Sequence, residues 1–180
     1  MEKYISILRG VNVGGRKVPM ANLKSLYEDL GFKEVITYIQ SGNVIFKADK
    51  TSGQTLEKII EKKINEIFNM AVPVIIRQVR EMKNVLANNP FLKMKGIDIN
   101  KLHVTFLEKL PGQNELDNTK KYDYTPDRFI IAGREVFLYC PGGYGKTKLS
   151  NNFFESKLKV HATTRNWKTV NKLVEIAAGK

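Results

Sequence analysis

The sequence has few of the residues from which disulfides and metal sites are built. Among its 180 residues it has one cysteine, Cys140, and two histidines, His103 and His161. A single cysteine cannot form an intrachain disulfide. The histidines lie in separate strand-like stretches, without cysteine or carboxylate partners at ligand spacing, so they do not indicate a zinc site. We therefore predict no metal site and no bound cofactor.

Long apolar runs are also missing. No segment reaches the roughly 20 apolar residues that span a bilayer, and the N-terminal stretch lacks the apolar run of a signal peptide. These absences predict a cytoplasmic protein without a membrane segment.

Residue patterns of familiar catalytic sites are absent as well. No pair of carboxylates stands out for acid–base chemistry, and Ser41 has no identifiable base. Cys140 ends an apolar run at residues 137–140, which is typical of a strand end, and there we expect a buried thiol rather than a nucleophile. The sequence therefore predicts no particular reaction.

What the chain has in excess is positive charge. Its 30 Lys and Arg against 18 Asp and Glu give a net charge of +12. This charge favours anionic partners such as nucleic acid, nucleotides, acidic metabolites or a membrane surface, and a solvated lysine surface is the alternative explanation. Residues 141–180 contribute half of the net charge, so we expect an anionic partner to contact this segment.

Hydrophobic periodicity predicts a βαββαβ order in the first half of the chain. Apolar residues recur at helical spacing over residues 20–30, and Gly31 stands where a helix C-cap belongs. Residues 41–43 separate two β-rich runs, as in a hairpin. The predicted elements are a strand at 4–8, a helix at 20–30, strands at 35–40 and 44–47, a helix at 54–69 and a strand at 72–79. This is the order of a ferredoxin-like unit.

A weaker copy of this order follows a connecting helix at 81–88. The predicted elements are a strand at 102–107, a helix at 114–122, strands at 129–131 and 136–139, a helix at 148–158, a strand at 160–163 and a last helix that carries Trp167. The predicted fold class is α+β, with two ferredoxin-like (βαββαβ) halves at residues 1–90 and 91–180 and a C-terminal helix. Because no linker rich in Gly, Ser or Pro separates the halves, we expect them to pack together.

Each half contains a loop rich in glycine and cations. The first glycine loop, residues 9–17, reads RGVNVGGRK, and the second glycine loop, residues 141–148, reads PGGYGKTK. Each follows a predicted strand and precedes a predicted helix. In that arrangement backbone N–H groups and cationic side chains can face a bound anion together. Glycines that merely permit a tight turn are the alternative.

Topology predicts which residues join each loop. In a βαββαβ unit, the end of the first strand and the turn between the next two strands lie at one edge of the sheet. The first glycine loop should therefore neighbour residues 40–43, and by the same argument the second should neighbour residues 163–166. In this hypothesis arginines and a lysine provide charge, glycines offer N–H groups, and Asn and Ser side chains orient the ligand. The candidate ligand-binding residues are Arg9, Asn12, Gly14, Gly15, Arg16, Ser41, Asn43, Gly142, Gly143, Lys146, Arg165 and Asn166.

The second glycine loop does not match a P-loop. The pattern G-x-x-x-x-G-K-[ST] fits Gly145, Lys146 and Thr147, but it requires a glycine where Cys140 stands. Nucleotide hydrolysis of the P-loop type is therefore not predicted. Residues 41–46 also lack the aromatic doublet by which RNA-recognition motifs stack bases.

The last helix has a basic start. We predict that Thr163 or Thr164 caps it, which would place Arg165, Lys168 and Lys172 on one face near the positive end of the helix dipole. A solvated face opposite the apolar side of this helix is the alternative.

Six stretches carry a resemblance to a known family: LRGVNVGG at residues 8–15, MANL at 20–23, YIQSGNV at 38–44, NPF at 89–91, PGGYGK at 141–146 and TTRNW at 163–167. In this combination the chain resembles the bacterial family catalogued as domain of unknown function 1697. Val11 stands where many members are expected to have Ile. The resemblance implies a cytoplasmic α+β protein with a ferredoxin-like first half, and it supplies no reaction.

The leading hypothesis from the sequence is a protein that binds a phosphate-bearing anionic ligand through the two glycine loops. One alternative is an enzyme that acts on a phosphorylated small molecule at the interface of the halves. The other is a nucleic-acid-binding module, which would lose affinity steeply with salt.

Overall fold

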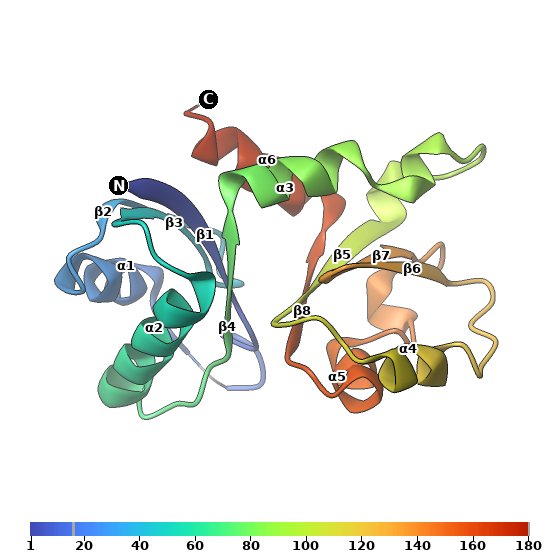
Figure 1. Cartoon of the computed structure of the whole chain (residues 1–180), viewed down its shortest axis with the longest axis horizontal. Coiled ribbons are helices and arrows are strands. Elements are labelled where there is room, and N and C mark those ends of the chain that lie inside the picture. The colour runs from blue at the N-terminus through green and yellow to red at the C-terminus, as the bar shows by residue number, and fades with distance from the viewer. Residues whose placement is uncertain (16, 180) are drawn as a thin grey trace. The chain divides into compact units, whose positions relative to one another are not determined.

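The computed structural model describes residues 1–15 and 17–179 (Figure 1). The chain divides into two compact units, of which the first contains Met1–Lys83 and Lys172–Lys180 and the second contains Asn84–Asn171. Each unit contains one four-stranded antiparallel sheet in βαββαβ order, and a helix ends the chain. The predicted α+β fold class is confirmed.

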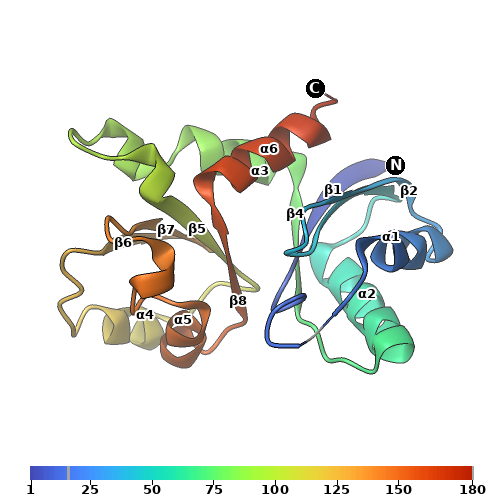
Figure 2. The same ribbon diagram turned by 180° about the vertical axis from the view of Figure 1, so that it is seen from behind.

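The sheet of the first unit has the strand order β2-β3-β1-β4, and β1 pairs antiparallel with both β3 and β4. The helices α1 and α2 cover one face of this sheet (Figure 2). The elements of this part of the chain are β1 (Glu2–Leu8), α1 (Met20–Asp29), β2 (Lys33–Tyr38), β3 (Asn43–Ala48), α2 (Gly53–Phe68) and β4 (Val74–Gln78).

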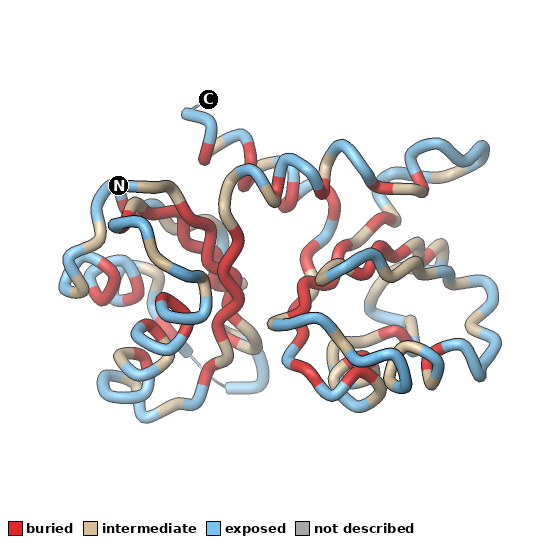
Figure 3. Tube along the Cα trace, in the orientation of Figure 1, coloured by how far each residue is buried: buried red, intermediate tan, exposed pale blue. Residues whose placement is uncertain are grey.

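The core of the first unit lies between the sheet and these two helices. Because side chains alternate between the faces of a strand, Tyr4, Ser6 and Leu8 of β1 share the face that the helices cover. The ring of Phe46 in β3 lies 5.2 Å from that of Tyr27 in α1. The Tyr27 hydroxyl is 2.6 Å from Ser6 Oγ, and burial raises the pKa of this tyrosine. Figure 3 shows this arrangement in the burial of the chain: the centres of the strands are buried, and the outer faces of the helices are exposed.

The ends of these helices have clear local causes. Leu30 is the C-cap of α1, so the predicted cap at Gly31 lies one residue too far along the chain. Gly31 follows the cap with φ +82° and donates its N–H to Glu28 O at 2.9 Å. Ser52 caps α2 by accepting a hydrogen bond from Thr55 N at 3.1 Å. Asn69 ends α2 in the left-handed conformation.

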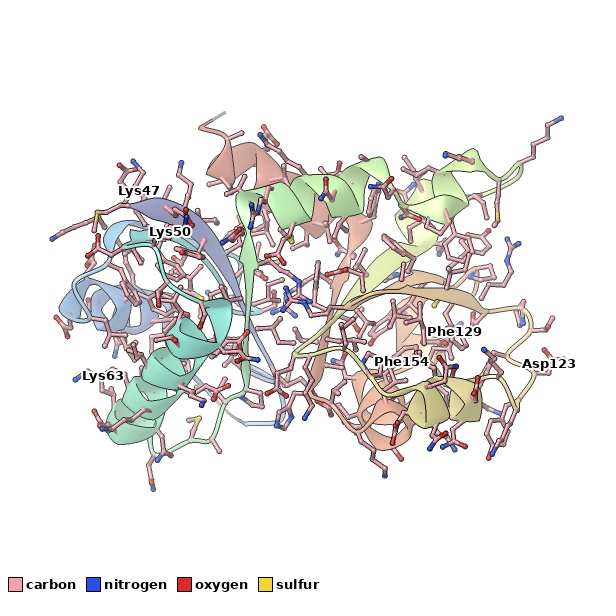
Figure 4. The ribbon with its side chains drawn as sticks, viewed as in Figure 1. Lys47, Lys50, Lys63, Asp123, Phe129 and Phe154 are labelled. Atoms are coloured by element: carbon pink, nitrogen blue, oxygen red, sulfur yellow. The ribbon has the colours of Figure 1, made fainter. Side chains whose placement is uncertain are left out.

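The sheet of the second unit has the equivalent strand order β6-β7-β5-β8, and α4 and α5 cover one of its faces (Figure 2). Phe129 and Phe154 face one another in its core, with ring centroids 5.6 Å apart (Figure 4). The remaining elements of the chain are α3 (Val79–Ala87), η1 (Pro90–Lys93), η2 (Ile99–Lys101), β5 (Leu102–Leu107), α4 (Gln113–Thr119), β6 (Arg128–Ala132), β7 (Glu135–Tyr139), η3 (Tyr144–Lys146), α5 (Asn151–Leu158), β8 (Ala162–Asn166) and α6 (Trp167–Ala177).

Several boundaries in the second unit differ from the prediction. The helix expected at 114–122 ends at Thr119. The helix expected from residue 148 begins at Asn151, because Ser150 caps it by accepting from Phe153 N at 3.3 Å. The strand expected at 160–163 lies at Ala162–Asn166, because these residues pair with β5. Thr163 and Thr164 therefore lie inside a strand, and the prediction that one of them caps the last helix is wrong.

The end of the chain returns to the first unit. Lys3 Nζ in β1 donates a hydrogen bond to Ala177 O in α6 at 2.9 Å. Among the helices of the described residues, none combines the length and the apolarity that crossing a membrane requires.

Candidate functional site

The first glycine loop contacts the turn between β2 and β3, as the topology predicted. Leu8 N donates to Gly42 O at 2.9 Å, and Asn12 Nδ2 donates to Gln40 O at 2.7 Å. Gly42 has φ +77°, and a Cβ at this position would lie 2.4 Å from Val11 Cγ2. Only glycine allows this close approach, so the turn and the loop form one packed edge of the sheet.

Asn12 holds the first glycine loop closed. Its Nδ2 also donates to Val18 O at 3.0 Å, and its Oδ1 accepts from Val18 N at 2.8 Å. The residue itself has φ +55°, a left-handed conformation that asparagine tolerates. The side chain thus ties the loop to Val18, which follows it, and to the neighbouring turn. Its amide positions the loop.

Gly14 and Gly15 form the exposed tip of this loop. Their φ angles are +57° and +86°, and a side chain at either position would meet open space. Within the described residues, neither N–H donates a hydrogen bond to another protein group. Lys17 on the same loop is exposed, and Arg9 is half-buried with its N–H donated to Pro73 O at 2.9 Å. Arg16, another predicted ligand, lies outside the described residues.

Ser41 and Asn43 close the neighbouring turn. Asn43 is fully buried, and its Nδ2 donates to Tyr38 O and to Ser41 Oγ, each at 3.1 Å. Ile39 in the same turn has φ +51° and is 46% exposed. A β-branched residue in this region of φ is a strained conformation that the surrounding hydrogen bonds must maintain.

The second glycine loop is folded onto itself. Gly143 has φ +94°, Gly143 N donates to Cys140 O at 2.9 Å, and Lys146 N donates to Gly143 O at 3.1 Å. The ring of Tyr144 stacks on that of His103 at 4.8 Å. Gly142 and Lys146 are exposed. Much of the hydrogen-bonding capacity of this backbone is therefore used within the loop.

Titratable groups beside the second loop are buried rather than activated. Burial lowers the pKa of His103, so its imidazole is held in the neutral form. Burial raises the pKa of the Cys140 thiol to about 11, and the residue is fully buried as predicted. Thr147 Oγ1 donates to Asp127 Oδ2 at 2.5 Å and accepts from Leu149 N at 3.0 Å. These contacts anchor the loop to the unit.

Arg165 and Asn166 lie in β8, on opposite faces of the second sheet. Asn166 is paired with His103, the residue on which Tyr144 stacks, so the loop and the end of β8 share an edge as predicted. Asn166 Oδ1 accepts from Thr169 N at 2.7 Å and caps α6. Arg165 is 8% exposed and is paired with Val104, one residue along, so its side chain lies on the face away from Tyr144. The structure does not bring Arg165 and Tyr144 of the second glycine loop onto one face.

Arg77, which no sequence pattern indicated, repeats the position of Arg165. Arg77 is fully buried in β4 and is paired with Ile5 of β1, and Arg165 occupies the same place in β8 opposite β5. Each arginine donates to the carbonyl of the residue before it, at 3.0 Å and 2.9 Å. In each case one residue separates the arginine from the helix that follows. Aligning the two halves on strand and helix order would have matched these arginines.

A metal centre has no obvious place in the described residues. Across 1–15 and 17–179, no three His, Cys, Asp or Glu side chains gather closely enough to hold a metal ion.

Comparison with known proteins identifies a family and a similar structure. A family model described as protein of unknown function (DUF1697) matches residues 1–137. The structure of conserved bacterial protein SP0830 from Streptococcus pneumoniae is similar, with a TM-score of 0.77 over 98% of each chain and 22% sequence identity. At this identity the similarity shows a shared fold. No curated protein matches the chain.

Proposed function

Because this chain belongs to the DUF1697 family of proteins of unknown function, its ligand must be inferred from its own residues, and we propose that it binds a phosphate-bearing anion at the first glycine loop. The observation that carries this proposal is that the N–H groups of Gly14 and Gly15 have no acceptor among the residues that the structure describes. Successive N–H groups in turn conformations form concave anion sites in many proteins. Phosphate oxygens are their usual acceptors.

The Asn12 side chain supports this assignment because it fixes the loop in advance. Its three hydrogen bonds to Val18 and Gln40 fix the conformation of the loop without a ligand. A loop that is already ordered loses little conformational entropy on binding, which leaves more of the interaction free energy for affinity.

The start of α1 adds a second supporting feature. This helix has no side-chain cap and no acidic residue in its first turn, whereas Ser52 and Ser150 cap α2 and α5. Its first N–H groups and the positive end of its dipole follow the glycine loop directly in the chain. Lys17 is the last residue of the loop and precedes α1, so cationic and N–H groups are combined in one short segment.

The experiment is an NMR titration of the ¹⁵N-labelled protein with inorganic phosphate and pyrophosphate. The amide signals of Gly14 and Gly15 should move and saturate, whereas those of Gly96 and Gly133 should stay in place. These four glycines all have positive φ; a Cβ would meet open space at three of them and would lie 3.9 Å from Glu135 Oε2 at Gly133. Unmoved Gly14 and Gly15 signals at high phosphate, or an equal shift with chloride at matched ionic strength, would overturn the proposal.

A double variant supplies the matched control. Alanine in the left-handed region costs roughly 1–2 kcal/mol per residue, so Gly14→Ala with Gly15→Ala should depopulate the open tip and weaken phosphate binding at least about tenfold. Gly96→Ala with Gly133→Ala imposes the same backbone cost away from the loop. It should leave the affinity unchanged.

A further inference from the structure

A polar hollow of about 340 Å³ lies between α4 and α5 in the second unit. Neither glycine loop contributes to it. Four lining residues come from α4 and the turn after it, and three come from α5 and its C-cap. They are Glu115, Asn118, Lys121, Tyr122, Ser156, Lys157 and Lys159.

Three lysines give this hollow an excess of positive charge. Lys121 Nζ donates to the neutral Asn118 Oδ1 at 2.8 Å, and Lys157 Nζ lies 4.6 Å from the centre of the Tyr122 ring. Within the described residues, Lys121, Lys157 and Lys159 form no ion pair. Glu115 is the one carboxylate in the lining, so cations outnumber it by three to one.

Tyr122 places an aromatic ring among these cations. Lys157 Nζ lies over one face of the ring and donates to its hydroxyl at 3.4 Å, and the ring of Tyr124 lies 6.2 Å away. The Tyr122 side chain is 55% exposed. The residues that follow it in the chain are anchored to the second unit. Tyr124 packs against Phe129 and Phe153 at 5.4 Å and 5.3 Å, and Asp123 accepts from Thr125 N at 2.9 Å. Asp123 lies in the segment that follows α4 (Figure 4). The exposed ring is therefore held in place by an anchored backbone.

Lys159 occupies a position where glycine is the usual residue. It ends α5 with φ +55°, and its N–H donates to Glu155 O at 3.0 Å. A lysine in the left-handed conformation is less favourable than glycine at a helix C-cap. The conformation fixes the direction in which this side chain leaves the helix.

We propose that the hollow binds single-stranded nucleic acid, with one base stacked on Tyr122 and the adjoining phosphates at Lys121, Lys157 and Lys159. Cations that flank an exposed aromatic ring are the combination by which proteins hold single strands. An inorganic phosphate would use the lysines alone, whereas the ring adds a surface for a planar base. The proposal does not depend on the first glycine loop.

The test is the fluorescence anisotropy of a labelled ten-nucleotide oligothymidylate, measured against salt. Lys157→Ala with Lys159→Ala should lower the slope of log K against log salt by about 1.4, since each phosphate contact on a single strand contributes about 0.7. The control, Lys93→Ala with Lys95→Ala, removes the same charge from the same unit and should keep the slope. Equal slopes in the two double variants would overturn the proposal.

The aromatic contact is tested separately. Tyr122→Ala should weaken oligonucleotide binding at least about fivefold, and Tyr122→Phe should retain it, because stacking needs the ring and not the hydroxyl. If Tyr122→Ala binds as the wild type does and pyrophosphate displaces the oligonucleotide completely, the hollow is a plain phosphate site and the proposal is wrong.

Lys159→Gly separates binding from folding. Glycine relieves the left-handed backbone, so the melting temperature should stay the same or rise while oligonucleotide affinity falls. Asn69→Gly makes the same exchange at the C-cap of α2 and should leave affinity unchanged. Unchanged affinity in Lys159→Gly would count against the proposal. Gly14→Ala with Gly15→Ala should leave the salt slope unchanged, which distinguishes this hollow from the phosphate site proposed above.

Discussion

Replacing Asn12 by alanine tests whether one side chain holds the first glycine loop closed. The substitution removes two hydrogen bonds donated by Nδ2 and one accepted by Oδ1, and it leaves the N–H of the buried Val18 without that acceptor. A neutral hydrogen bond contributes a net of about 0.5–1.5 kcal/mol, and alanine at positive φ costs about 1 kcal/mol more. We expect the free energy of unfolding to fall by about 3–5 kcal/mol.

Asn69→Ala is the control for the backbone part of this cost. Asn69 has φ +51°, close to the +55° of Asn12, and its exposed side chain makes no hydrogen bond to the described residues. Asn69→Ala should therefore cost only about 1 kcal/mol. The difference between the two variants measures the contribution of the Asn12 amide.

Urea denaturation and thermal melting would both measure this difference. In a protein of this size 1 kcal/mol shifts the melting temperature by about 2–4 °C, so Asn12→Ala should melt roughly 6–20 °C below the wild type. Asn12→Gly relieves the backbone, so its melting temperature should lie between those of Asn12→Ala and the wild type. If Asn12→Ala and Asn69→Ala agree within about 0.5 kcal/mol, the amide does not hold the loop and the reasoning fails.

Three further predictions concern the packed edge, the buried thiol and the last helix. Gly42→Ala should cost more than about 2 kcal/mol in urea denaturation, because its Cβ would lie 2.4 Å from Val11 Cγ2; Gly10→Ala, at a similar φ but in open space, should cost about 1 kcal/mol. The pKa of Cys140 is raised to about 11 from 9.0, so the free energy of unfolding should fall as pH rises through this window, and less so in Cys140→Ala. An equal pH dependence in both proteins would refute this assignment. Asn166→Ala should cost about 1 kcal/mol through loss of the α6 cap, and Asn166→Asp should retain most of it in thermal melts.

The neighbourhood of the first glycine loop could be predicted because antiparallel pairing fixes which loops share an edge. Residues 41–43 gave a hairpin signal, and the pairing of β1 with β3 then brings Gly42 beside Leu8. The use of each polar side chain could not be predicted in this way. Asn12 donates to a carbonyl 28 residues away, and no local pattern indicates such a bond. Whether an amide faces a ligand or a backbone carbonyl depends on tertiary packing.

The placement of Arg165 failed at the strand boundary. The predicted strand ends at Thr163, with Thr163 or Thr164 as the expected cap of the last helix, whereas the strand of the structure continues to Asn166. Pairing with β5 overrides the local pattern. Once the strand is known, its period of two assigns Arg165 and Asn166 to opposite faces. The strand boundary was therefore the missing information.

The return of the chain end to the first unit has a consequence for protein synthesis. Lys172–Lys180 belong with Met1–Lys83, and Lys3 in the first strand bonds to Ala177 near the last residues. A ribosome makes the whole of Asn84–Asn171 in between, which at about 5–20 residues per second takes on the order of 5–20 s. During this time the nascent first unit lacks its closing segment. Synthesis of Lys172–Lys180, rather than emergence of the first half, completes it.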